Sequence, residues 1–205
     1  MARWDPDAQG RLQAAAMELF TERGYDDVTV AEIAVRAGLQ KRSFFRHYTD
    51  KREVLFTGSA DFQRTVVDIV RAAPTSMTPI NAVMAALAQG GTGLTDWGEP
   101  VRQRQRIVSS ARELRERELI KMDALTAAVA DALRHRGVQD ITATLLAQVG
   151  VAAFMTAFQQ WSEAAEPQDF ASIIDDALTR LRAALCEPQW SAQAHQRPTV
   201  PALPA

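Results

Sequence analysis

The chain has 205 residues and a mass of 22.6 kDa, with 47% hydrophobic residues, 23% charged residues and a formal net charge of −2. These values are ordinary for a compact globular protein, and they exclude wholesale disorder, a collagen-like repeat and a coiled-coil rod. The single cysteine, Cys186, excludes an intramolecular disulfide and a multi-cysteine metal site. Cysteine usage therefore favours a reducing compartment.

The N-terminal part of the sequence predicts a helix-turn-helix arrangement. An amphipathic helix is expected over residues 7–23, because its apolar residues recur at i, i+3, i+4, i+7 and i+8. Thr29 and Glu32 have the spacing of a capping box, which predicts the start of a second helix. Gly38 is placed to end that helix, and a third short helix is expected over residues 40–48.

The remaining sequence also predicts helices. Asp50 indicates the start of a long fourth helix that ends before Pro74. The glycine-bearing segment 89–97 predicts a mobile loop, and we find no credible strand. Further helices are expected over residues 79–89, 99–110, 112–136, 140–164 and 167–185. The sequence thus predicts an all-α fold of about nine helices.

The sequence shows no recognisable export signal or membrane span. The best apolar run, residues 145–158, is interrupted by Gln148 and Thr156 and stays below the roughly 18 to 20 apolar residues that cross a membrane. Residues 1–7 carry one arginine and two aspartates, and no apolar region follows them as it does in a signal peptide. We therefore expect a cytoplasmic protein with no membrane contact.

The charges are distributed unevenly along the chain. Between Arg36 and Arg52 there are six basic residues and one acidic residue, which give a local charge of +5. The rest of the chain has 17 basic and 24 acidic residues, which give a charge of −7. A cationic segment on an acidic body is typical of a local contact with a polyanion such as DNA.

The third predicted helix carries side chains that suit a DNA major groove. Lys41 and Arg42 stand at its N-terminal end, from which they can reach guanine O6 and N7. Phe44 is expected to face inward. Further donors, suited to phosphates and bases, are Ser43, Arg46, His47 and Tyr48. The alternative is a solvated basic face on a small helical bundle, and helix-turn-helix geometry alone does not separate the two.

A resemblance to a known family extends over residues 14–56. This segment reads AAAMELFTERGYDDVTVAEIAVRAGLQKRSFFRHYTDKREVLF and is similar to the N-terminal signature of the TetR family of transcriptional regulators. The matching features are Phe20, Gly24, Tyr25, Thr29, Ile33-Ala34, Ala37-Gly38, Phe45, His47-Tyr48, Lys51 and Leu55. The resemblance implies a three-helix DNA-binding domain over residues 1–50, a helical ligand-binding and dimerisation domain over residues 51–186, and a Pro-rich tail, 187–205, outside the core.

The resemblance also implies roles for individual residues. It places against DNA bases Gln40, Lys41, Arg42 and Arg46. It places against phosphates Thr29, Val30, Ser43, Phe45, His47, Tyr48 and Lys51. Three positions depart from the usual pattern: Gln40 replaces a frequent capping serine, Arg42 a glycine or proline, and Phe45 a tyrosine. Because phenylalanine has no hydroxyl to give to a phosphate, we expect that role to pass to Tyr48.

The resemblance implies a homodimer formed through the last two long helices, around residues 140–164 and 167–185. Small residues and a leucine-isoleucine stripe on these helices agree with a four-helix bundle across a two-fold axis. A core within one subunit explains the same stripe and is the alternative reading.

A mostly apolar cavity for a small-molecule effector is expected in the body. Its predicted lining is Met84, Leu87, Trp97, Met122, Phe154, Met155, Phe158 and Trp161. Plain core packing, and for Trp97 a solvated loop position, are the alternatives. The arginines between Arg102 and Arg117 either attract an anionic ligand or lie on a self-paired helix surface.

The sequence contains no recognisable catalytic, metal-binding or cofactor-binding signature. The three histidines are far apart, and the GGTG segment at residues 90–93 lacks the ending of a P-loop. We therefore expect a non-enzymatic, ligand-responsive repressor that binds a palindromic operator in double-stranded DNA as a homodimer. The alternatives are an all-helical enzyme and a transcriptional activator or protein-interaction module.

Overall fold

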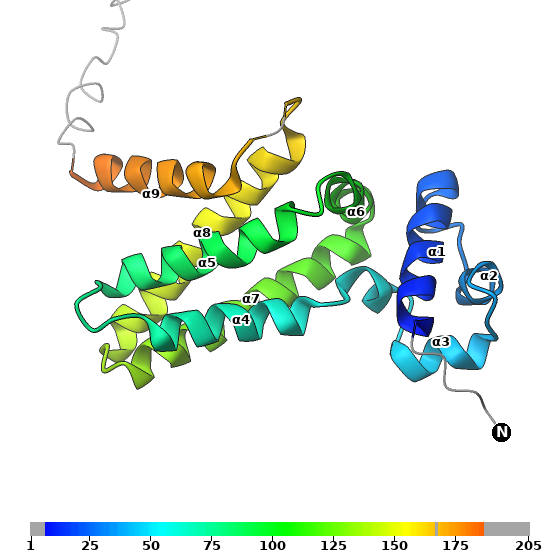
Figure 1. Ribbon diagram of the computed structural model, residues 1–205, viewed down its shortest axis with the longest axis horizontal. Helices are drawn as coiled ribbons and strands as arrows, with labels where there is room; N and C mark the ends of the chain where they lie inside the picture. Colours follow the sequence, from blue (N-terminus) through cyan, green and yellow to red (C-terminus); the bar gives the residue numbers. More distant parts are fainter. Residues whose placement is uncertain (1–6, 167, 187–205) are drawn as a thin grey trace, which may run out of the picture.

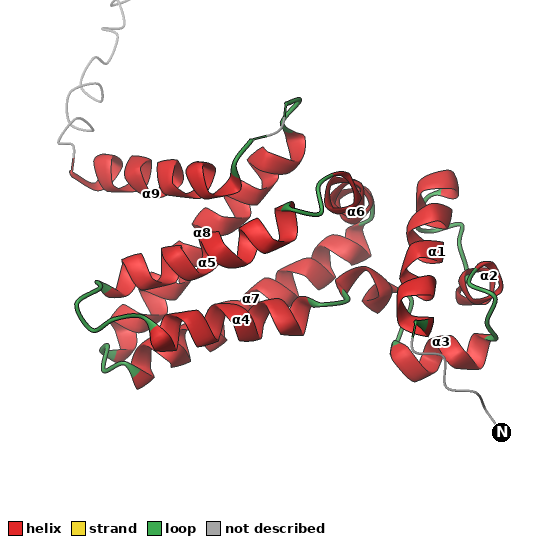
Figure 2. Ribbon diagram, viewed as in Figure 1, coloured by secondary structure: helices red, strands yellow, loops and turns green. Residues whose placement is uncertain are grey.

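The computed structural model describes residues 7–166 and 168–186, and this part of the chain is all-α, as predicted (Figure 2). It contains nine α-helices and one 3₁₀ helix, η1, and no strand occurs within these ranges. In chain order the helices are α1 (Ala8–Arg23), α2 (Val30–Arg36), α3 (Lys41–His47), η1 (Arg52–Phe56), α4 (Ser59–Ala72), α5 (Pro79–Thr95), α6 (Glu99–Ser110), α7 (Arg112–His135), α8 (Asp140–Glu163) and α9 (Phe170–Cys186). The predicted tail, 187–205, lies outside the described residues.

The described helices pack around two separate hydrophobic cores. Helices α1 to α3 lie at one end of the molecule, and α4 to α9 form a larger body (Figure 1). The first core joins α1 to α3 and η1 to the corner where α6 meets α7. That corner contributes Ile107, Val108, Ala111 and Leu114. The second core lies among α4, α5, α7, α8 and α9. The short N-terminal helices are therefore held partly by residues that come much later in the sequence.

The long fourth helix expected after Asp50 is interrupted, so that prediction was wrong. η1 ends at Phe56, Thr57 is extended, and Gly58 has a φ of 85° in the left-handed region that favours glycine. The apolar pattern runs through this break because it serves two cores. Val54 belongs to the first core and Val66 belongs to the second. Apolar spacing alone therefore did not reveal the end of one element and the start of another.

The mobile loop expected over residues 89–97 is mostly helix, because α5 continues to Thr95. Gly90 and Gly91 lie inside this helix and are buried. A Cβ atom on Gly91 would lie 2.0 Å from Cε1 of Phe170, and one on Gly90 would lie 2.9 Å from Cε2 of Phe62. These glycines allow aromatic rings to approach the α5 backbone and do not form a turn.

Helix α8 carries two different faces. Its inner face contributes Gly150, Phe154 and Trp161 to the body, where it packs against α5, α7 and α9. Its outer face presents Ile141 and Leu145, which are 76% and 54% exposed. By length and composition α8 would be able to cross a membrane, although part of it is buried within the protein. Here the hydropathy belongs to a core helix whose outer face is also partly apolar.

Candidate nucleic-acid interface

The capping box expected at the start of α2 is present. The Thr29 hydroxyl oxygen accepts a hydrogen bond from the backbone N–H of Glu32 at 3.3 Å, and the Thr29 N–H donates to Oε2 of Glu32 at 2.8 Å. Hydrogen bonds from Thr29 and Arg23 lower the pKa of the Glu32 carboxyl to about 2. Gly38, with a φ of 69°, then ends α2, and Leu39 N–H donates to the Ala34 carbonyl at 2.8 Å. This turn sets the angle between α2 and α3.

Helix α3 is anchored by one buried side chain. Phe44 is 0% exposed and its ring contacts that of Tyr48, with centroids 5.1 Å apart. The exposed surface of α3 carries Lys41, Arg42 and Arg46. In the described part of the chain no carboxylate lies within 4.0 Å of these three cations. Their charges are therefore open to an external anion.

The other cations of the positive segment bind partners within the same chain. Arg36 donates to Glu18 and Glu22, with all three distances at 3.1 Å, and these hydrogen bonds raise the pKa of its guanidinium. Arg52 pairs with Asp50 at 2.9 Å. The exposed cationic surface is accordingly narrower than the local charge count indicated, and it is concentrated on α3.

Lys51 points into the protein, not toward solvent. Its Nζ donates to the carbonyl oxygens of Tyr25 at 2.8 Å and Val28 at 2.9 Å, and it lies 3.9 Å from the centre of the Tyr25 ring. Burial lowers the pKa of this ammonium group. The expected contact between the Lys51 ammonium and a phosphate does not match this arrangement, because two of its three N–H donors bind backbone carbonyls and the group lies against the Tyr25 ring. Lys51 instead fixes the α1–α2 connection.

Tyr48 is also turned inward, with 5% of its surface exposed. Its hydroxyl lies 3.0 Å from Thr57 Oγ1 and donates to the Gln9 carbonyl at 3.4 Å. It therefore does not take over the phosphate contact that Phe45 lacks. The remaining phosphate candidates lie at the surface or partly so: Thr29, Val30, Ser43, Phe45 and His47. Gln40 is exposed at the N-cap of α3 and makes no side-chain capping bond.

Replacing Lys51 with methionine is expected to lower the free energy of unfolding by about 1–3 kcal/mol, because two carbonyl groups lose a charged donor. The measurement is urea denaturation followed by circular dichroism. Lys41→Met is the matched control, since Lys41 is exposed and its loss should change stability by no more than about 0.5 kcal/mol. Equal effects of the two substitutions would contradict the inward role of Lys51.

Polar contacts join the α1–α3 unit to the body. Glu53 of η1, whose side chain is 17% exposed, pairs with Arg117 and, at 3.1 Å, with Lys121 of α7. Arg104 of α6 donates to the Leu55 carbonyl at 2.9 Å and pairs with Glu118 at 2.9 Å. Sequence reasoning missed these contacts, since neither helical spacing nor local charge indicates a partner so distant in the chain.

The arginines between Arg102 and Arg117 are mostly paired within the protein. Arg112 pairs with Glu116 at 2.8 Å, four residues further along α7. Arg117 pairs with Glu53 of η1 and not with Glu113, which stands four residues before it on α7. Arg102 lies against the Trp161 ring, with 4.8 Å to its centre, and donates to the Ala164 carbonyl at 2.8 Å.

The predicted ligand-binding residues are mainly packed side chains of the body core. Met84, Leu87, Phe154 and Trp161 are at most 5% exposed, and Met122, Met155 and Phe158 pack against them. Trp97 is separate from this group and is 74% exposed. The structure thus brings seven of the eight residues into one cluster.

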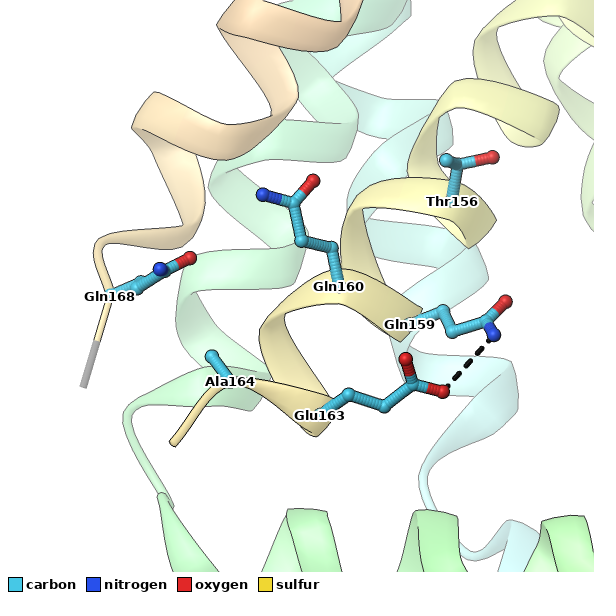
Figure 3. Close-up of a pocket in the computed structure, with 6 residues that line it drawn as sticks. All are labelled: Thr156, Gln159, Gln160, Glu163, Ala164 and Gln168. Carbon is cyan, nitrogen blue, oxygen red and sulfur yellow. Dashed lines mark hydrogen bonds between the residues drawn. The ribbon is translucent and has the colours of Figure 1, made fainter. Parts of the chain in front are cut away.

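Two cavities lie near the C-terminal end of α8 and the N-terminal end of α9. A shallow one of about 460 Å³ is lined by polar side chains at the end of α8, including Gln159, Gln160 and Glu163 (Figure 3). A second, of about 360 Å³, lies between the end of α5, the start of α6 and the start of α9. Arg102, Trp161 and Phe170 line this second cavity. Of the eight predicted ligand-binding residues, Trp161 lines this cavity, and none of the eight lines the first.

Comparisons with known proteins match both parts of the chain. Residues 12–57 match the family described as bacterial regulatory proteins, tetR family, and residues 77–186 match the MftR C-terminal domain. The transcriptional regulator TcmR of Streptomyces glaucescens is 32% identical over 76 residues, which are 37% of this chain and 34% of TcmR. The aligned segment is therefore only about a third of that relative's length.

Solved structures share the fold over most of the chain. The SmeT–triclosan complex has a TM-score of 0.61 and 19% identity, and the match covers 84% of this chain and 90% of SmeT. NalD of Pseudomonas aeruginosa, described as a secondary repressor of a multidrug efflux pump, has a TM-score of 0.63 and 15% identity, covering 87% of this chain and 97% of NalD. At sequence identities of 19% and 15%, the similarity to these two structures shows a shared fold and nothing beyond it.

Proposed function

Because the chain belongs to the TetR family of bacterial regulatory proteins, we propose that it is a ligand-responsive repressor that binds a palindromic operator as a homodimer. A small molecule in the helical body would release it from DNA. The similar proteins are regulators, which favours binding over catalysis. Such a protein acts in the cytoplasm, where the DNA is.

The observation that carries this proposal is the open cationic face of α3. Lys41, Arg42 and Arg46 are exposed and have no carboxylate partner within the described ranges. We assign base contacts to these three residues and to Gln40, and phosphate contacts to Ser43 and His47 and to the N-terminal end of α2 at Thr29 and Val30. Base contacts carry sequence information and phosphate contacts fix the position of the protein on the duplex.

The function is tested by selecting duplexes from a random library with the purified protein. We expect a palindrome whose half-sites are separated by about one helical turn, roughly 34–36 Å, or a multiple of it. Replacing Arg42 with alanine should reduce the preference for the selected duplex over random duplex by about 1–3 kcal/mol per half-site. Fluorescence anisotropy measures both affinities.

A matched control for Arg42→Ala is Arg112→Ala, which removes an exposed arginine from α7, far from α3 in the chain. This control should leave the preference unchanged. If Arg42→Ala kept the full preference for the selected duplex, Arg42 would not read bases. If no duplex were selected at all, the proposed function itself would be wrong.

We propose that the dimer forms through α8 and α9. In support, the outer face of α8 carries Ile141, Leu145, Gln148, Ala152 and Thr156 at helical spacing, and all of them are exposed in the single chain. Two large apolar side chains followed, on the same face, by a small residue suit close packing of a second helix. In such an assembly the polar cavity at the end of α8 would lie at the edge of the interface.

We propose that the effector binds beside the aromatic cluster of Phe154, Phe158 and Trp161. The cavity of about 360 Å³ adjoins Trp161, and the similar SmeT structure holds triclosan. Methionine side chains adapt readily to a guest, so Met84, Met122 and Met155, with Leu87, are proposed to complete the lining as the core opens. Trp97 is proposed as an outer contact.

Helix α6 is the proposed route from the effector to DNA. Arg102 lines the cavity, and on the same helix Gln103 donates to Thr21 of α1 at 2.6 Å, while Arg104 holds η1. A ligand that displaces Arg102 would shift α6 and with it the α1–α3 unit. Release requires that the ligand bind the shifted state more tightly than the DNA-competent state.

A further inference from the structure

Phe45 is an apolar ring on the DNA-facing side of the molecule. It is 51% exposed, whereas the adjacent Phe44 is 0% exposed and fills the core. The two rings meet edge to face, with centroids 5.6 Å apart and planes at 78°. This contact restricts the motion of the Phe45 ring but leaves half of its surface without a partner in the single chain. A half-exposed ring contributes little to the stability of the fold. A contact with a molecule outside the protein therefore explains an aromatic residue at this position better than core packing does.

The helical spacing of α3 places Phe45 with the base-reading side chains. Residues three and four positions apart are neighbours on a helix surface, so the neighbours of Phe45 are Arg42 and Lys41. The proposed phosphate contacts Ser43 and His47 are neighbours of each other on the other side of Arg42 and Arg46. The ring therefore belongs to the surface that would face base edges. It also lacks the hydroxyl that a phosphate contact from this position would need.

We propose that Phe45 is a specificity-determining residue that recognises the C5 methyl group of thymine in the major groove. This inference rests on the proposed function, and it replaces the phosphate contact expected for this position. Of the four bases, only thymine presents a methyl group in the major groove. Phenylalanine is a suitable apolar partner for that group. Since Arg42 and Lys41 suit guanine, a thymine next to a guanine is expected in each half-site.

The test uses the full-length protein and the duplex that it selects from a random library. Each thymine of that duplex is replaced in turn by deoxyuridine, which removes only the C5 methyl group. For one thymine per half-site we expect the affinity of the unmodified protein to fall about fourfold, and more than about tenfold when both half-sites are changed. Phe45→Ala should bind the thymine and deoxyuridine duplexes equally, and Phe45→Tyr, which keeps the ring, should still distinguish them.

The outcomes separate this inference from the proposed function. Selective binding with no effect of any deoxyuridine substitution would overturn the role of Phe45 and leave the repressor proposal intact. If the deoxyuridine substitution lowered the affinity equally in the unmodified protein and in Phe45→Ala, the methyl contact would belong to another residue. That result would also overturn the role of Phe45. Failure to select any duplex would overturn both. Circular dichroism should show an unchanged fold, because Phe45 is half exposed.

Discussion

Replacing Gly91 with alanine is expected to destabilise the body by about 1–2 kcal/mol. The new Cβ would lie 2.0 Å from Cε1 and 2.6 Å from Cδ1 of Phe170, a ring that is 1% exposed and contacts Phe154 edge to face. Overpacking of this kind typically lowers stability by about 1–3 kcal/mol. The better helix propensity of alanine offsets about 0.5–1 kcal/mol of that loss. Urea denaturation followed by circular dichroism gives the change.

Gly93→Ala on the same helix is the matched control. No heavy atom lies within 4 Å of the Cβ position at Gly93, so only the helix propensity changes and stability should rise by about 0.5–1 kcal/mol. Phe170→Leu should partly rescue Gly91→Ala, because the smaller side chain leaves room for the methyl group. A similar gain in stability at both glycines would show that the close approach of Phe170 does not require glycine.

Replacing Ala152 with glutamate is expected to convert the proposed dimer into a monomer and to weaken operator binding by about 10²–10⁴-fold. Ala152 is exposed in the middle of the outer face of α8, so two glutamates would meet near the two-fold axis without a partner. Loss of the second reading unit then removes the gain from simultaneous binding to two half-sites. Analytical ultracentrifugation gives the mass, and fluorescence anisotropy with the selected duplex gives the affinity.

Ala127→Glu provides the corresponding control on α7. This alanine is also exposed in the single chain, and the same change there should affect neither the mass nor the affinity. Circular dichroism must show that Ala152→Glu remains helical. If Ala152→Glu kept the mass of the unmodified protein, the subunit contact would have to lie elsewhere than on the outer face of α8.

Local signals predicted most helix boundaries well. α6 spans Glu99–Ser110 as expected, and α7 and α8 end one residue before the expected positions. The Thr29–Glu32 capping box formed because all of its groups lie within four consecutive residues. Boundaries of this kind depend on neighbouring residues, so the sequence contains the information needed to place them.

The direction of a side chain was harder to predict when its partner lies elsewhere in the chain. Lys51 turns inward because the carbonyls of Tyr25 and Val28 offer it two acceptors, and nothing beside it in the sequence indicates them. Likewise, glycine favours both turns and close helix packing. Only the position of Phe170, far along the chain, shows that Gly91 serves the second purpose. The roles of Lys51 and Gly91 can therefore be assigned only once the three-dimensional arrangement is known.

The shared first core has a consequence for building hybrid regulators. Val54, Leu55 and Phe56 belong to one core with Ile107, Val108 and Leu114, so a graft that moves only the leading helices onto a foreign scaffold would remove part of the apolar core on which they pack. A working chimaera of this protein would have to carry over the α6–α7 corner as well, or recreate its apolar surface in the recipient. Swapping specificity by transplanting α3 side chains alone avoids this difficulty.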